Sequence, residues 1–143
     1  MTLKEACDEH LLDSDLIARD GKTFCNIFVQ RVSKELDCSS LNGLTANQIY
    51  DLCNQDKDWS AVDPDVAHAG SKQGYLVIAA IKDRPHGHVA ICYPSLMVYS
   101  GKWRRYCPQV ASVGAKNGIF GCNWAFKEMP TFFLYKGGVV NPR

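Results

Sequence analysis

The chain has 143 residues, of which 46% are hydrophobic and 22% are charged, and its formal net charge is +1. This size and composition predict one globular domain over residues 1–143, and the near-neutral charge argues against nucleic acid or an anionic membrane as the main partner. No segment approaches the ~20 apolar residues of a membrane span. The charged first nine residues do not resemble a signal peptide.

Two helices are expected on either side of a turn at Asp20-Gly21. Residues 3–18 carry apolar side chains at helical spacing, which predicts a first helix that ends before this turn. After the turn, a second apolar stripe repeats at the period of a helix laid on a core. The second stripe consists of Phe24, Phe28, Val32 and Leu36.

Cys25 falls in the first turn of the second predicted helix, for which Thr23 is the expected N-cap. A thiol there lies among backbone N–H groups that lack intrahelical partners, at the positive end of the helix dipole. Both features favour the thiolate, so Cys25 is a candidate nucleophile if a histidine is suitably placed. The competing interpretation is a small core residue, because cysteine is among the most often buried residue types.

Residues 38–72 contribute a third helix and a polar segment. Thr45 is the expected N-cap of a short helix over residues 46–53. Residues 54–72 are polar, and either Trp59 and Val62 anchor them as a loop or residues 66–69 form one short helix. His68, in this segment, is interpreted as a loop histidine.

The strongest strand pattern is the apolar run at residues 74–81, followed by a hairpin-like connection and a returning strand at 88–93. Alternation places His88, Ala90 and Cys92 on one face of the returning strand. Helices followed by strands favour an α+β fold, with N-terminal helices packed on a central antiparallel sheet. Further strands are predicted at residues 96–99, 110–113 and 131–135, with turns at 100–101 and 116–118.

The cysteine count is high for a chain of this length. An odd number is compatible with one reactive thiol and up to three disulfides, and no pairing is favoured. Cys7 and His10 form only an isolated half-site for a metal, and no Cys-x-x-Cys pair is present, so no metal or other cofactor is predicted. His10, among acidic neighbours, is expected at the surface. The seven cysteines are Cys7, Cys25, Cys38, Cys53, Cys92, Cys107 and Cys122.

A helix N-terminal cysteine followed 63 residues later by a histidine that opens a core strand is similar to the layout of papain-like thiol hydrolases. Residues 24–32 around Cys25, residues 74–81 and residues 87–91 around His88 also resemble the type VI secretion amidase effectors, small members of the NlpC/P60 and CHAP group of cell-wall peptidases. The resemblance spans about residues 20–115. It implies a papain-like NlpC/P60 fold.

The resemblance further implies a secreted antibacterial enzyme that hydrolyses amide bonds in peptidoglycan peptides. The target bonds in this family are the D-glutamyl–diaminopimelate stem bond and the diaminopimelate–D-alanine cross-link, with closer motif similarity to enzymes for the first. Cys25 carries over as nucleophile and His88 as general base and acid. Family members act in the periplasm of a rival bacterium and are inhibited by a periplasmic immunity protein; a monomer is expected.

Two alternatives to this function stay open. The same two residues would serve a thiol hydrolase of another acyl substrate, a protein side-chain amide or a lipid ester. In a non-catalytic cell-wall-binding module, Cys25 would be a core residue and His88 a hydrogen-bonded strand residue.

The third catalytic position is open as well. Cys107 aligns best with the His, Asn or Gln that NlpC/P60 enzymes place on the strand after the histidine strand, and Gln109 lies two residues on. A thiol is a poor hydrogen-bond partner, so a backbone carbonyl is the third alternative, and Cys107 would fit a disulfide equally well. His86, Trp103 and Trp124 are candidates for the walls of the cleft.

Overall fold

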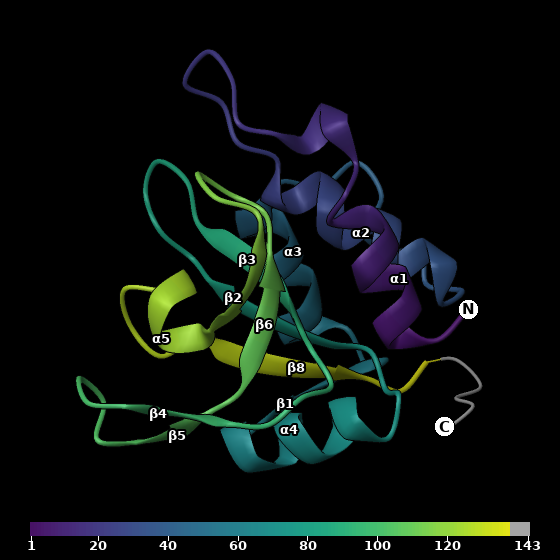
Figure 1. The fold of residues 1–143 in the computed structure, drawn as a ribbon. Helices are drawn as coiled ribbons and strands as arrows, with labels where there is room; N and C mark the ends of the chain where they lie inside the picture. The colour runs from purple at the N-terminus through teal and green to yellow at the C-terminus, as the bar shows by residue number, and fades with distance from the viewer. Residues whose placement is uncertain (138–143) are drawn as a thin grey trace.

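The computed structural model describes residues 1–137, which form an α+β fold as predicted (Figure 1). A six-stranded antiparallel sheet has the order β1-β8-β2-β3-β6-β7, and β4 pairs with β5 separately. No helix in residues 1–137 has the length and apolar character needed to cross a membrane. The elements are α1 Leu3–His10, η1 Ser14–Leu16, α2 Cys25–Glu35, α3 Ala46–Gln55, β1 Trp59–Val62, α4 Pro64–Lys72, β2 Val77–Ile81, β3 His88–Cys92, β4 Val98–Ser100, β5 Arg105–Cys107, β6 Gln109–Ser112, β7 Gly118–Gly121, α5 Cys122–Ala125 and β8 Thr131–Tyr135.

Both faces of the sheet are covered, with α1, α2 and α3 on one side and α4 and α5 on the other (Figure 1). Along β3, Val89 and Ile91 face the first layer, whereas Ala90 and Cys92 face the second, as the predicted alternation requires. Residues 77–80 of β2 alternate between the layers in the same way and are all fully buried. Burial on both faces therefore explains why the sequence of this strand is an unbroken run of apolar residues.

The N-terminal region differs from its prediction in two respects. The first helix does not continue to Ala18; it begins with a capping box at Thr2 and ends at His10. Leu12, which belongs to the apolar stripe, is 84% exposed, so the helical spacing beyond His10 does not correspond to a buried face. The N-cap of α2 is Phe24 rather than Thr23, and no side chain caps this helix. The turn at Asp20-Gly21 is confirmed, because both residues have positive φ.

In the polar segment 54–72, the predicted alternative of a short helix at residues 66–69 is confirmed as part of α4, and β1 was not predicted. Residues 59–62 form β1, which pairs with the C-terminal strand β8, and α4 follows with Asp63 as its N-cap. His68 lies on α4, and its Nε2 atom is 2.9 Å from the carbonyl oxygen of Ser95. The predicted helix after Thr45 is confirmed as α3 and has a complete capping box.

The strands that follow β3 are only partly as predicted. Strand β8 has the predicted bounds, and β4 and β6 lie within two residues of theirs. Strands β5 and β7 and the short helix α5 were not predicted. Gly118, which was assigned to a turn, is the first residue of β7.

Candidate active site

Cys25 is the first residue of α2, and α2 packs directly against β3. Its Sγ atom accepts hydrogen bonds from backbone N–H groups of Val89, Asn26 and Cys25 itself. Val89 directly follows His88 in β3, so Cys25 at the start of α2 lies next to the strand residue that follows His88. The N-cap residue Phe24 has no side chain that could cap the N–H groups of this first turn.

Cys25 also differs from the other cysteines in exposure. All seven are free thiols, but Cys25 is 8% exposed, whereas the other six are at most 2% exposed. The predicted possibility of up to three disulfides is therefore not realised in this structure. Cys25 is the thiol that solvent and substrate can reach most easily.

His88 is the first residue of β3, and other atoms of the protein pack closely against the backbone just before it. A Cβ atom on the preceding Gly87 would collide with the carbonyl oxygen of Ile81 and with Asn47 Oδ1, so only glycine fits there. The ring of Phe126 lies 5.0 Å from the His88 ring, centroid to centroid. A Cβ on Gly114 would lie 3.7 Å from His88 Cε1. These contacts hold the imidazole between β3, the turn after β6 and the segment after α5.

The polar partner of His88 is Ser112, on the neighbouring strand β6. Ser112 Oγ lies 2.9 Å from His88 Nε2, and Ser112 is 4% exposed. The sequence analysis did not single out this residue. Strand pairing could have found it: β3 and β6 are aligned so that Cys92 faces Val110, which places Ser112 on the same face as Ala90 and His88.

The structure does not bring Cys107 or Gln109 to the imidazole. The thiol of Cys107 donates to Asn123 Oδ1 at 3.6 Å, and its side chain is fully buried beside Cys122. Gln109 Nε2 donates to the carbonyl oxygen of Leu96 at 3.0 Å. Both side chains therefore have hydrogen-bond partners other than His88.

Burial sets the charge state of both reactive groups. It raises the pKa of the Cys25 thiol, and the backbone N–H groups that favour the thiolate only partly offset this effect. Burial also lowers the pKa of His88 from 6.5 to about 4. The sequence-based expectation of a thiolate is therefore replaced by a neutral thiol beside a neutral imidazole at neutral pH.

A cleft of about 440 Å³ opens in front of His88 and Ser112. One end is formed by Thr23, which precedes α2, and the floor by the turn at residues 114–116. Phe120 of β7 and Trp124 of α5 form the far wall. Trp124 thus lines the cleft as predicted and is 83% exposed, whereas Trp103 and the exposed His86 are not part of its lining.

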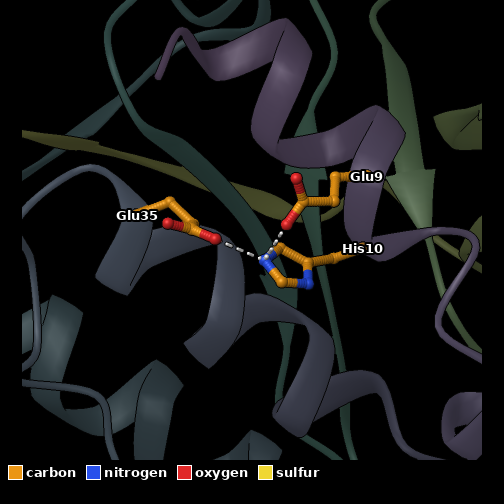
Figure 2. Close-up of side chains that lie close together, drawn as sticks. All are labelled: Glu9, His10 and Glu35. Carbon is orange, nitrogen blue, oxygen red and sulfur yellow. Dashed lines mark hydrogen bonds and ion pairs between the residues drawn. The ribbon is translucent and has the colours of Figure 1, made fainter.

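A second histidine cluster lies outside this cleft. His10 of α1 points toward Glu9 and Glu35, and Figure 2 shows the three side chains with their ion pairs. On the other side of the ring, Nδ1 lies 2.7 Å from Asp13. Partial burial alone would lower the pKa of His10, but the hydrogen bonds to Asp13 and Glu35 raise it above its usual value.

Glu9, His10 and Glu35 are the one group within residues 1–137 that has the spacing of metal ligands. A metal ion would have to replace the proton on Nε2, which the adjacent carboxylates stabilise. We therefore interpret the cluster as an ion-paired contact between α1 and α2. This location is consistent with the surface role expected for His10.

Comparison with known proteins places the chain in a family. No family model matches it. A peptidoglycan amidase is 34% identical over 116 residues, which cover 80% of this chain and 73% of that relative. The chain therefore belongs to the peptidoglycan amidase effector family that its motifs resemble. The relative is peptidoglycan amidase Tse1 of Pseudomonas aeruginosa.

Proposed function

We propose that residues 1–143 form one catalytic domain of NlpC/P60 type, a cysteine amidase that hydrolyses amide bonds in peptidoglycan peptides. The observation that carries the proposal is the meeting of α2 and β3, where the Val89 N–H contacts Cys25 Sγ and the adjacent His88 is held by Ser112. Cys25 is the nucleophile, and His88 is the general base and acid. No cofactor is needed for this chemistry.

The charge states define how the reaction starts. His88 Nε2–H donates to Ser112 Oγ, which leaves the lone pair on Nδ1 to accept a proton. As Cys25 Sγ attacks the amide carbonyl, its proton moves to Nδ1, and the oxyanion is stabilised by the N–H groups at the start of α2. His88 then gives the proton to the leaving amine, and water hydrolyses the thioester with His88 as base.

The substrate bond is the D-glutamyl–diaminopimelate stem bond or the diaminopimelate–D-alanine cross-link. The cleft has the size and one-sided opening expected for an extended peptide rather than a large folded partner. As an antibacterial effector, the protein would act as a monomer in the periplasm of a target cell. The producing cell would be protected by an immunity protein that blocks the cleft. Family membership supports the peptidoglycan substrate, whereas the bond, the monomer and the immunity protein are proposed from the motif resemblance alone.

The test compares Cys25→Ala with Cys53→Ala, which removes a second buried helical thiol far from the cleft. We expect wild type and Cys53→Ala to release new muropeptides from sacculi, with the cleaved bond identified by mass spectrometry. Cys25→Ala should lower the rate at least about 1000-fold while its melting temperature stays close to that of wild type. An active Cys25→Ala protein would contradict the cysteine mechanism.

Alkylation gives an independent measure of the same site. Iodoacetamide near neutral pH should label Cys25 before the six less exposed thiols, and labelling should abolish hydrolysis. Labelling spread over several cysteines in the folded protein, with activity retained, would favour a non-catalytic binding module. Hydrolysis of protein amides or lipid esters in place of sacculi would favour the other acyl substrates.

A further inference from the structure

The lining of the cleft carries charge of one sign. Lys116 is the one residue of the lining, other than His88, that has an ionisable side chain, and no Asp or Glu contributes to the lining. Since burial keeps His88 neutral near pH 7, Lys116 determines the sign of the potential in the cleft. The cleft is therefore suited to an anionic group.

Lys116 also lacks a protein partner in the part of the chain that the structure describes. Within residues 1–137 it forms no ion pair, whereas six other cationic side chains are paired with carboxylates. 

The paired cations are Lys4, His10, Arg31, Lys82, Arg105 and Lys127. The Lys116 ammonium group is thus available to a ligand.

The backbone that carries Lys116 is held in place from both sides. Asn117 Oδ1 accepts a hydrogen bond from the Gly114 N–H at 3.0 Å, which closes the turn. Asn117 Nδ2 donates to the carbonyl oxygen of Leu16 at 3.0 Å, which fixes the turn to the segment before α2. Because Gly114 lies against the His88 ring, the same turn joins the reacting centre to Lys116. A group bound by Lys116 would therefore lie near the scissile bond.

The opposite wall of the cleft is apolar and open. Trp124 lines it and is 83% exposed. Such exposure is unusual for tryptophan, because burial of its large apolar surface would contribute strongly to the free energy of folding or binding. An alkyl chain of a bound peptide would cover the indole ring. The lining of the cleft therefore combines one cation with an exposed apolar side chain.

We propose that Lys116 is a specificity residue that binds a free carboxylate of the stem peptide next to the scissile amide, with Trp124 covering the adjoining alkyl chain. This inference rests on the proposed function. Two carboxylates have the required chemistry, the α-carboxylate of the D-glutamyl residue and a carboxylate of diaminopimelate. An ammonium–carboxylate contact in a partly enclosed cleft changes affinity by about 10- to 100-fold.

The experiment compares three synthetic stem peptides: the free acid, the D-glutamyl α-carboxamide and the diaminopimelate carboxamide. Wild type should cleave the free acid with a kcat/KM about 10- to 100-fold above that for one of the two carboxamides, which identifies the bound carboxylate. Lys116→Gln should raise the KM for the free acid by a similar factor and lose the discrimination, with kcat little changed. Lys116→Arg, which keeps the charge, should retain the preference.

Lys57→Gln is the matched control, since Lys57 is exposed and precedes β1 at the opposite edge of the sheet from β7. It should behave as wild type, and melting temperatures should be similar for all variants. Discrimination that survives in Lys116→Gln, or its absence in wild type, would overturn this inference alone. If wild type cleaves none of the peptides, the proposed function fails and the inference fails with it.

Discussion

His10 and His88 are the same side chain in two opposite environments. His10 of α1 has Asp13 at Nδ1 and Glu35 of α2 at Nε2, and its pKa is raised. Figure 2 shows the contact with Glu35. His88 lies at the start of β3 with a serine hydroxyl at Nε2, and burial lowers its pKa to about 4. The ring beside carboxylates is thus biased toward its protonated form, whereas the buried ring without them is neutral near pH 7.

This comparison predicts which histidine the reaction needs. Replacing His88 with Asn should lower kcat/KM at least about 1000-fold, because the proposed general base is lost. Replacing His10 with Asn should leave kcat/KM within about threefold of wild type and lower the melting temperature, because it removes contacts with Asp13 and Glu35. The measurements are muropeptide hydrolysis and thermal unfolding of both variants. A large loss of activity in His10→Asn would contradict the division of roles.

His10 and His88 should also affect the pH dependence of the free energy of unfolding in opposite ways. The folded-state pKa of His88 is depressed, so its contribution is fully present above about pH 6.5 and is lost as the pH falls toward 4. A shift of this size corresponds to about 3 kcal/mol. The folded-state pKa of His10 is raised, so its contribution is fully present below about pH 6.5 and is lost as the pH rises through the folded-state value.

Denaturant unfolding between pH 4 and 9 would separate these contributions. His88→Asn should flatten the loss of stability between pH 6.5 and 4, and His10→Asn should flatten the loss above pH 6.5. The carboxylates of Asp13 and Asp15 also titrate at low pH, so the difference between wild type and each variant is the quantity to compare. Identical pH profiles for wild type and His88→Asn would mean that the ring is not buried in its neutral form.

The candidate catalytic residues and the other lining residues of the cleft differ in how far they could be predicted from sequence. Cys25 and His88 belong to elements with strong periodic patterns, an amphipathic helix and a buried strand, and these patterns placed both residues correctly at the starts of α2 and β3. Lys116 and Trp124 lie in a turn and in a four-residue helix, where no periodicity indicates orientation. Their position depends on contacts such as Asn117 with Leu16, which are distant in sequence.

Ser112 illustrates a further limit of prediction from the sequence. Its strand was predicted, but its contact with His88 depends on which strands are neighbours and on their register. The sheet order β1-β8-β2-β3-β6-β7, with the C-terminal strand inserted between β1 and β2, follows from long-range packing that no local pattern records. Sequence spacing therefore favoured Cys107, whereas pairing brings Ser112 to the ring.

The smallest expected effect tests whether Ser112 or Cys107 is the third group of the site. Ser112→Ala should lower kcat about 10-fold with little change in KM, because His88 loses the partner that fixes its tautomer and orientation. Ser112→Thr, which keeps the hydroxyl, should recover part of this loss. A shift in the acidic limb of the pH–rate profile of Ser112→Ala would show that the substitution acts through His88. This readout separates a positioning role from simple loss of stability.

Cys107→Ala is the matched substitution on the other candidate. It should leave kcat within about twofold of wild type and cost about 1–2 kcal/mol of unfolding free energy, because it removes a fully buried sulfur that contacts Asn123. Steady-state kinetics and denaturant unfolding of the two variants provide the comparison. A 10-fold fall in kcat for Cys107→Ala, with Ser112→Ala unaffected, would reverse the assignment. Because the hydroxyl lies on the imidazole and the thiol lies under α5, we expect the kinetic effect to follow Ser112.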